Sequence, residues 1–283
     1  MGSIRANLTE FRRKKRSLGS ARRWRQTWQS PSKLRDGCEI IIERVSSNDK
    51  RQIFQQFLNE ILVSNILHHK NLVTFRGYAF HHEKFLVAHE YLSNGTLAAY
   101  LECEIQHNKC TLPLLTRMEI AIDIANALSY LHKHGIIHHN INSSNILLDK
   151  SMCAKVAGLH LSVNKETSRG CRVSYRSDVY SFGAVLFELI SSKPAFWREV
   201  PHGEAVGLAK FAIIKLLNNT LKELVDPDIG YDSDKDVPEM VTAVAELAFQ
   251  CIQCPKELRP SMKQVLETLE GIKKGTWGFN QII

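Results

Sequence analysis

The sequence predicts an α+β fold in which a small β-rich part precedes a larger helical part. Short β-branched and aromatic runs, the usual pattern of strands, are concentrated near the beginning of the chain. Long segments with apolar residues at helical spacing dominate the rest. The chain has 283 residues, of which 44% are apolar, and this is enough to bury the core of one large or two small domains.

The first predicted strands lie on either side of a helix. A run of three isoleucines, Ile40 to Ile42, follows the turn pair Asp36-Gly37. Two further strand-like runs cover Leu72 to Phe75 and Phe85 to Ala88. We therefore expect a small sheet with one helix packed on it, because apolar residues recur at helical spacing at Phe54, Phe57, Leu58, Ile61 and Leu62.

Helices are predicted after the turn pair Asn94-Gly95. One helix should end at Gly135, and another should begin near Ser177 or Asp178 and stop before Pro194. Two later helices should carry a proline in the first turn, at Pro238 and Pro260. A short hairpin is expected between the first two of these helices, with strands at 146–148 and 154–157.

The basic charge of the chain is concentrated at its N-terminus. Residues 1–35 contain eleven Lys and Arg residues and one Glu residue, whereas the whole chain has 37 Lys and Arg against 29 Asp and Glu. We expect a disordered basic tail over residues 1–33. An anionic membrane surface, nuclear import and nucleic acid are its alternative uses. Trp24 and Trp28 lie between the arginines without favouring membrane or nucleic acid, and no specific nucleic acid is expected as a partner.

Several classes of protein are excluded by what the sequence lacks. No stretch approaches 18 uncharged apolar residues, and no apolar run follows the basic N-terminus, so we expect neither a transmembrane helix nor a signal peptide. The seven cysteines are scattered and odd in number, which indicates reduced thiols in the cytoplasm. Cys251 and Cys254 form one C-x-x-C in a helical pattern, and without a second pair of ligands they are expected to pack rather than to bind zinc.

The residues around the predicted hairpin narrow the fold. Residues 130–149 read YLHKHGIIHHNINSSNILLD, and they resemble the catalytic loop of protein kinases, H-R-D-x-K-x-x-N, together with its flanks. Residues 177–183 (SDVYSFG) and 258–262 (LRPSM) are similar to a later helix and to the R-P-x-M segment of that family. Five further segments resemble plant receptor-like serine/threonine kinases of the leaf-rust-resistance or wall-associated type. They are residues 34–43, 57–60, 69–73, 90–97 and 245–274.

This resemblance implies a protein-kinase-like fold with two lobes. It divides the chain into a juxtamembrane-like tail at 1–33, a small N-lobe at 34–91, a helical C-lobe at 92–274 and a C-terminal tail at 275–283. The cofactors of the family are ATP and magnesium. The departures from the family pattern fall on the residues that handle these cofactors.

The expected phosphate-binding parts are changed most. Only Leu18-Gly19-Ser20 remains of the glycine-rich loop that lets backbone amides approach the phosphates. The family's phosphate-binding lysine falls on Glu43, and the helix glutamate with which it pairs is Glu60. Two carboxylates facing each other at contact would repel by roughly 1 to 4 kcal/mol. His89 takes the gatekeeper position beside the hinge residues Glu90 and Tyr91, whose backbone groups persist, so ATP binding is expected to be weak or lost.

The catalytic-loop positions His138, His139, Asn140 and Asn142 are degenerate. The aspartate base of the family is Asn140, and losing a general base typically costs ~10² to 10⁴ in rate. The loop lysine is Asn142. The magnesium-binding asparagine is retained as Asn145, whereas the D-F-G aspartate falls on Gly158, which leaves a neutral amide as the magnesium ligand. His160 is an alternative ligand for a softer metal, although a lone histidine is more often packed or solvent-facing.

The segment that follows the D-F-G position is short. Gly158 and Asp178 are 20 positions apart, too few for an activation loop with its A-P-E triplet. Arg259 pairs with the glutamate of that triplet in the family and is expected to lack this partner. Asp178, Gly183 and Arg259 are structural positions of the family, and all three are retained.

These residues predict a non-catalytic kinase domain, or pseudokinase, that acts in signalling by binding a protein, such as an active receptor-like kinase. The alternatives are an ATP-dependent serine/threonine kinase with residual activity and a truncated, non-functional gene product. The basic residues of 11–25 predict a peripheral contact with the anionic inner face of the plasma membrane. A cytoplasmic location is otherwise expected.

Overall fold

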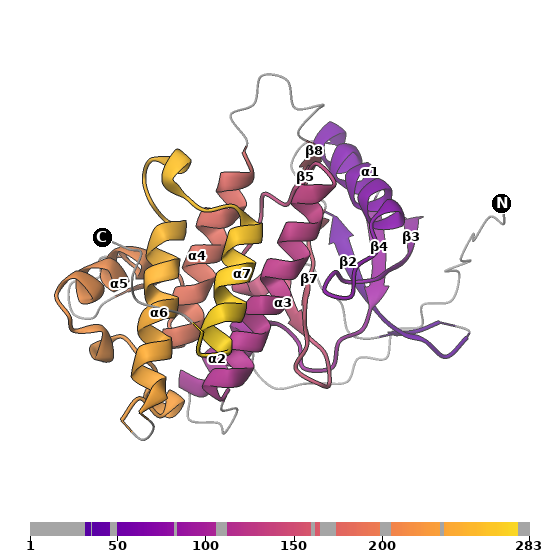
Figure 1. Ribbon diagram of the computed structural model, residues 1–283. Helices are drawn as coiled ribbons and strands as arrows, with labels where there is room; N and C mark the ends of the chain where they lie inside the picture. Colours follow the sequence, from indigo (N-terminus) through magenta and orange to yellow (C-terminus); the bar gives the residue numbers. More distant parts are fainter. Residues whose placement is uncertain are drawn as a thin grey trace. The chain divides into compact units, whose positions relative to one another are not determined.

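The computed structural model describes residues 32–34, 36–45, 50–81, 84–105, 112–159, 162–164, 174–198, 205–232 and 235–276. These residues belong to two units, one built on a sheet and one mostly helical (Figure 1). The division confirms the predicted α+β class. The basic tail up to residue 31, including segment 11–25 and Leu18 to Ser20, lies outside the described ranges, as does His160.

The sheet unit contains the described residues of 32–68 and 73–91 together with Leu159. Its antiparallel sheet has the order β1-β2-β4-β3. Helix α1 (Lys50–Ile66) contacts β2, β3 and β4. The strands of the sheet are β1 (Ser32–Lys33), β2 (Glu39–Val45), β3 (Phe75–His81) and β4 (Lys84–Glu90).

Side chains on the sheet alternate between two environments, as the period of a strand requires. Ile40, Ile42 and Ala88 form a buried cluster on one face, and Leu34 and Leu86 pack against it. The next positions along β4 belong to the other face, where the side chain of His89 lies next to Glu60 of α1. The helix therefore covers the face that carries His89.

The strand predicted from Leu72 to Phe75 begins later than expected. β3 starts at Phe75, whereas Leu72 forms a single bridge with Val156, and these two residues belong to the helical unit. Asn71 accounts for this difference, because its carbonyl accepts a hydrogen bond from the Val156 N–H (2.8 Å) and its side-chain amide donates to the Ala154 carbonyl (3.0 Å). One apolar run of the sequence is thus divided between two units.

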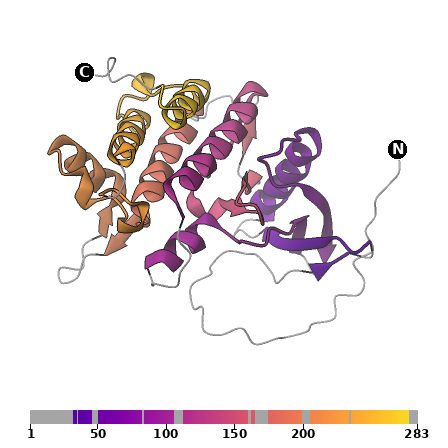
Figure 2. The same cartoon turned by 60° about the horizontal axis from the view of Figure 1, so that its bottom comes forward.

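The helical unit contains the described residues of 69–72, 92–158 and 162–276. Helix α3 packs against α4 and α7, while α6 packs against the same two helices, and Figure 2 shows these four helices side by side. Their facing side chains are apolar and buried, as for Ile124, Leu128, Phe182 and Val244. The helices of the unit are α2 (Leu97–Ile105), α3 (Leu114–Lys133), α4 (Tyr175–Ser191), α5 (Leu208–Leu217), α6 (Asp236–Cys251) and α7 (Met262–Lys273).

Short strands and single turns connect these helices. β6 (Ile146–Leu148) and β7 (Ala154–Val156) form the predicted hairpin. Two further antiparallel pairs are β5 (Ile136–Ile137) with β8 (Val163–Asn164) and β9 (Phe196–Arg198) with β10 (Ala205–Gly207). The 3₁₀ turns are η1 (Ser143–Asn145), η3 (Leu221–Glu223), η4 (Pro227–Ile229) and η5 (Lys256–Leu258).

The predicted helix ends are close to the observed ones. α3 ends at Lys133, and Gly135 has φ +78°, a left-handed conformation that glycine adopts readily. α4 begins two residues before Ser177, because the side chain of Ser174 accepts a hydrogen bond from the Arg176 N–H and caps the helix earlier. α7 begins after Ser261, which forms a capping box with Gln264, so Pro260 lies before the helix and not in its first turn as predicted.

The absence of a side chain at Gly183 lets α4 and α6 approach closely. A β-carbon at this position would lie 2.7 Å from Cβ of Cys251 and 2.8 Å from Cγ2 of Ile252. Both distances are shorter than real carbon atoms tolerate. Gly183 is therefore required by packing, as its structural position in the resemblance implies.

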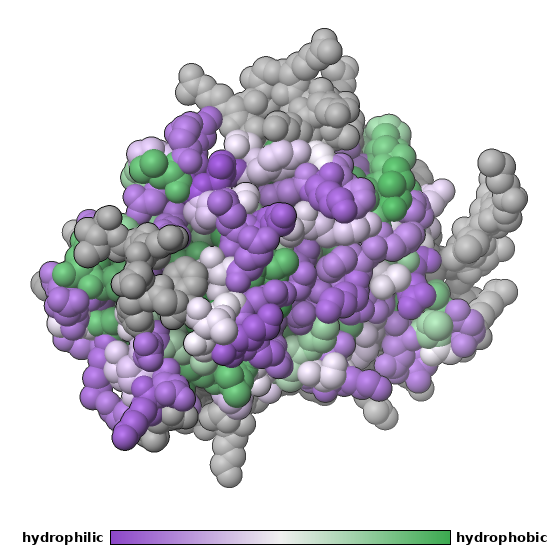
Figure 3. All heavy atoms as spheres, in the orientation of Figure 1, coloured by the Kyte–Doolittle hydropathy of each residue, from purple (hydrophilic) through white to green (hydrophobic). Residues whose placement is uncertain are grey.

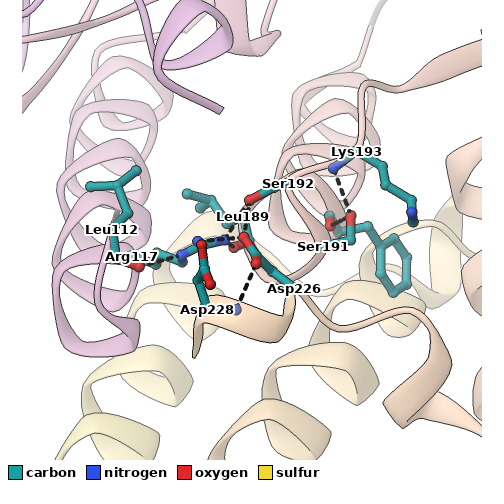
Figure 4. A network of polar contacts seen from close by, with 9 residues as sticks. Leu112, Arg117, Leu189, Ser191, Ser192, Lys193, Asp226 and Asp228 are labelled. Atoms are coloured by element: carbon teal, nitrogen blue, oxygen red, sulfur yellow. Dashed lines mark hydrogen bonds and ion pairs between the residues drawn. The ribbon is translucent and has the colours of Figure 1, made fainter. Parts of the chain in front are cut away.

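A buried arginine joins α3 to the end of α4 and to the chain that enters η4 (Figure 4). Arg117 is 1% exposed, and its guanidinium donates hydrogen bonds to the carbonyls of Leu112 and Leu189, each at 2.7 Å. It also donates to Ser192 Oγ (2.9 Å) and to Asp226 Oδ2 (2.7 Å). The Ser192 hydroxyl donates to the same carboxylate. Each buried charge is thus compensated, as burial requires.

Apolar residues gather over α5 on the face of the molecule drawn in Figure 3. Ile214 and Leu217 of this helix are 47% and 68% exposed, and Phe196 of β9 is 76% exposed. Within the described ranges, no helix combines the length and the apolar character needed to cross a membrane.

Candidate functional site

The loop that carries the kinase-like motif, residues 138–145, runs from β5 to β6 in the helical unit. His138 is fully buried, and its Nε2 lies 2.9 Å from the carbonyl oxygen of Ala157. The Asn140 N–H donates to Nδ1 of the same ring (3.2 Å). A carbonyl needs a donor and an N–H needs an acceptor, so the tautomer with its proton on Nε2 satisfies both partners. His138 thereby links the loop to the chain after β7 through hydrogen bonds.

The carboxylate of Asp178, in the first turn of α4, holds the start of this loop. Its Oδ2 accepts hydrogen bonds from the His138 N–H and from Nε2 of His132, and its Oδ1 accepts from the His139 N–H, each at 2.8 Å. Burial alone would raise the pKa of Asp178. The bond from His132, the electrostatic attraction of the His138 and His132 rings and the bond from the His138 backbone outweigh burial and leave that pKa lowered. His139 has φ +69°, an uncommon conformation that these bonds help to maintain.

Asn140 and Asn142, which are expected at the positions of the family's aspartate and lysine, interact with each other. The Asn142 side-chain amide donates to the Asn140 carbonyl (3.1 Å) and to Asn140 Oδ1 (3.2 Å). The Oδ1 of Asn142 accepts from the N–H groups of Ser144 (3.0 Å) and Asn145 (3.2 Å), which caps η1. A neutral pair of amides thus occupies the two positions, and Asn142 is committed to holding the backbone of the loop.

Asn145 and Gly158 lie against each other. Asn145 is 4% exposed, and its side-chain amide donates to the Asn140 carbonyl (2.8 Å). A β-carbon on Gly158 would lie 3.1 Å from Nδ2 of Asn145, and Gly158 has φ +87°. Any side chain at position 158 would therefore require a left-handed backbone and a small shift of Asn145.

The residues of this loop do not fit a magnesium site. Magnesium prefers octahedral oxygen coordination with at least one carboxylate in protein sites of this kind. Asn145 supplies a neutral amide and Gly158 supplies no side chain. Among the described residues, no group of three or more His, Cys, Asp and Glu side chains is arranged to hold a metal ion.

The sheet unit contains the other predicted site residues, Glu43, Glu60, His89, Glu90 and Tyr91. Glu43 lies opposite Val87 in the sheet, and its side chain is outside the described part. Its predicted repulsion with Glu60 stays a prediction. Glu60 and His89 are each 1% exposed, and His89 Nε2 lies 3.6 Å from Glu60 Oε1. A histidine of β4 thus lies beside the helix glutamate, a contact that sequence reasoning did not predict.

The hinge backbone is partly engaged within its own unit. The Glu90 N–H donates to the Thr74 carbonyl (3.0 Å), and the Tyr91 N–H donates to the Glu39 carbonyl (3.1 Å). The Glu90 carboxylate accepts from the N–H and the hydroxyl of Thr74, both at 2.9 Å. These two N–H groups are therefore used by the sheet and are not available to an adenine base.

Arg259 has partners other than the glutamate of an A-P-E triplet. Its Nε donates to the Gln253 carbonyl and its Nη1 to the Arg176 carbonyl, each at 2.8 Å. Arg176 in turn donates to the Arg259 carbonyl. The guanidinium also lies over the ring of Tyr180, 4.9 Å from its centroid. Backbone carbonyls at the start of α4 and just after the end of α6 thus satisfy this arginine.

The predicted site residues fall into two groups. The helical unit brings together His138, Asn140, Asn142, Asn145, Gly158 and Asp178, while the sheet unit contains the hinge and the Glu60–His89 pair. Sequence reasoning missed His132 and Arg117. Both are polar residues on an apolar stripe of α3. Such a residue indicates a buried polar contact but does not identify its partner.

Comparison with known proteins places these residues in a family. The family of protein tyrosine and serine/threonine kinases matches residues 20–170. From Arabidopsis thaliana, leaf rust 10 disease-resistance locus receptor-like protein kinase-like 1.2 is 40% identical over 267 residues, which cover 87% of this chain and 41% of that protein. Wall-associated receptor kinase-like 14 from the same plant is 32% identical over 268 residues, or 87% of this chain and 37% of the relative.

A shorter relative is the calmodulin-binding receptor-like cytoplasmic kinase 2 of Arabidopsis thaliana, 33% identical over 272 residues that cover 86% of this chain and 64% of that protein. The chain thus spans about two fifths of the length of the receptor-like relatives that it matches. The matched residues include the loop 138–145 and the hairpin after it. Its relatives include plant receptor-like kinases, and it has the two-lobed fold of protein kinases. The chain belongs to the protein tyrosine and serine/threonine kinase family.

Proposed function

We propose that this chain is a non-catalytic kinase domain that acts in signalling by binding a protein partner. The observation that carries the proposal is the amide pair of Asn140 and Asn142 in the catalytic loop. An amide nitrogen or oxygen does not take up a proton near neutral pH, so neither residue can serve as the base that orients a substrate hydroxyl. The loop is held by hydrogen bonds, and its residues His138, Ile141, Ser143 and Asn145 are buried.

The charges that phosphoryl transfer requires are also missing from the positions expected to supply them. Transfer of a phosphoryl group depends on positioning and on neutralising charge with lysine and magnesium. Glu43 and Gly158 replace the lysine and the magnesium aspartate. Parts that act as a unit do not contribute additively. Restoring one of them while the others are absent therefore does not restore a share of the activity. We therefore expect that Glu43→Lys alone recovers no phosphorylation.

The test is a phosphorylation assay of the purified chain with ATP, magnesium or manganese, and a generic protein substrate. Asn145→Ala is the matched control, because it removes the one retained metal-binding position. We expect no transfer by either protein. Phosphorylation that disappears in Asn145→Ala would come from this chain and would establish the alternative function, a serine/threonine kinase with residual activity. Phosphorylation that persists in Asn145→Ala would come from a contaminating kinase.

A thermal melt with and without magnesium and ATP distinguishes a folded binding domain, a domain that still binds nucleotide and a truncated product. A ligand that binds the folded state raises the melting temperature. We expect one cooperative transition that nucleotide does not move, as a folded binding domain requires. A rise in melting temperature would show that nucleotide binding survives, and the absence of a transition would favour a truncated, non-functional product.

The partner that we propose is a receptor-like kinase with intact catalytic residues. This proposal draws on the names of the relatives and on the retained packing residues Asp178, Gly183 and Arg259.

The polybasic residues of 11–25 are proposed to add a peripheral contact with an anionic membrane, at about 1 kcal/mol for each basic residue near the surface. Replacing Arg12 to Arg16 with alanine should release the protein from vesicles that contain phosphatidylserine, and unchanged binding would refute the contact.

A further inference from the structure

A buried carboxyl group of α4 joins two segments that are distant in sequence. Glu188 is 5% exposed. Its Oε1 accepts a hydrogen bond from the Ser143 hydroxyl (3.1 Å) and another from the Ala195 N–H (3.1 Å). Ser143 is the first residue of η1 in the loop 138–145, and Ala195 directly precedes β9. One oxygen atom therefore connects the kinase-like loop, α4 and the start of the β9–β10 hairpin.

No cation of the described residues forms an ion pair with Glu188. α4 packs against α3, α5, α6 and η5. Three cations of these neighbours bind other groups: Arg117 of α3 binds Asp226, Lys215 of α5 binds Glu223, and Arg259 after η5 binds backbone carbonyls. On α6, burial raises the pKa of the Cys251 thiol to about 12, so this group is neutral.

Loss of hydration therefore has the largest effect on the pKa of Glu188. Burial raises the pKa of Glu188 from its ordinary value of 4.5 to about 7, and the bonds from Ser143 and Ala195 oppose this rise without cancelling it. The proton is exchanged with the solvent near neutral pH. The charged form has two hydrogen bonds but no opposite charge to offset its loss of hydration.

We propose that Glu188 is a protonation-sensitive junction: with its proton bound, it holds the loop 138–145 and the chain before β9 against α4, and loss of that proton favours opening of this contact. The Ser143 hydroxyl and the Ala195 N–H can donate to Oε1 in both states. Deprotonation leaves a bare carboxylate in the interior, and opening the contact returns it to water. The inference does not depend on whether the chain binds ATP or a protein partner.

The sign of the effect follows from the direction of the pKa shift. A carboxyl group with a raised folded-state pKa binds its proton more tightly when the chain is folded. Its contribution to stability is complete below the ordinary value of 4.5 and is lost as the pH rises through about 7. The melting temperature should therefore fall across this interval.

The test compares melting temperatures of the whole chain and two variants from pH about 5 to about 9. Glu188→Gln keeps the shape and the acceptor oxygen but cannot titrate, so its melting temperature should fall less over this range than that of the unchanged chain. Glu257→Gln, at an exposed position on η5, should reproduce the unchanged profile. Equal profiles for Glu188→Gln and the unchanged chain would overturn the proposal.

A second variant and a local measurement keep the proposal testable if Glu188→Gln folds poorly. Ser143→Ala removes a bond that favours the charged form, so the fall in melting temperature should extend to higher pH. Amide hydrogen exchange, corrected for its intrinsic rate, should show less protection of Asn145 and Ala195 above neutral pH than below it. An unchanged Ser143→Ala profile, or exchange at these two amides that does not respond to pH, would contradict the junction.

Discussion

At the scale of single residues, Arg117 shows how strongly one buried charge can depend on its partners. Its guanidinium binds Asp226 and the carbonyls of Leu112 and Leu189 inside the helical unit. We expect Arg117→Met to lower the free energy of unfolding by about 3 to 5 kcal/mol, because it leaves the Asp226 carboxylate buried without its cation. Urea-induced unfolding followed by circular dichroism measures this change.

The matched control is a surface ion pair. Lys273 and Glu119 lie 2.9 Å apart with both side chains more than a third exposed. Lys273→Met should therefore change the free energy of unfolding by no more than about 1 kcal/mol. Similar losses for Arg117→Met and Lys273→Met would contradict the role assigned to burial.

The Glu60–His89 pair makes a second prediction at this scale. The two side chains are buried and 3.6 Å apart, so their contributions to stability should not be independent. In a double-mutant cycle with Glu60→Gln and His89→Gln, we expect a coupling free energy of about 0.5 to 3 kcal/mol. Additive losses in the two single variants would show that His89 has not taken over as a partner of the helix glutamate.

At the scale of elements, the contact between α4 and α6 depends on Gly183. We expect Gly183→Ala to destabilise the helical unit by about 1 to 3 kcal/mol, because the new methyl group would overlap Cys251 and Ile252. Gly77 of β3 is the control, since a β-carbon there would meet no atom within 4 Å. Gly77→Ala should change stability by less than Gly183→Ala in the same denaturation experiment.

Periodicity and turn residues predicted most elements because they depend on local sequence. The isoleucines of β2, the stripe of α3 and the stop of α4 before Pro194 are examples. The run at Leu72 was assigned wrongly to a strand of the sheet, because its partner Val156 is distant in sequence. The same limit applies to the site: the motif predicted where the loop 138–145 lies, but not that Asn142 would cap η1 or that backbone carbonyls would satisfy Arg259.

At the scale of the whole molecule, buried carboxyl groups set the dependence of stability on pH. The pKa of Asp178 is lowered despite its burial by bonds from His132 and from the loop backbone, and the pKa of Asp226 is lowered despite burial by Ser192 and Arg117. Groups with lowered pKa stabilise the fold above their ordinary value of 3.8 and lose this contribution as the pH falls below it. We expect the melting temperature to decrease steeply on acidification below this value.

Calorimetry across a pH series checks this prediction, with Asp178→Asn as the comparison. An asparagine at position 178 can accept hydrogen bonds from the loop through one oxygen only and carries no charge. The variant should be less stable than the unchanged chain at neutral pH and should differ from it less in acid. A difference that is constant across the series would contradict the assignment of the acid limb to Asp178.

The three asparagines of the loop 138–145 also affect how this part of the molecule responds to ions. Asn140, Asn142 and Asn145 bind one another and the backbone through neutral amides. Dissolved salt screens interactions between charges and has little effect on hydrogen bonds between uncharged groups. The hydrogen bonds among these three asparagines join uncharged groups, so their geometry should be the same in low and high ionic strength.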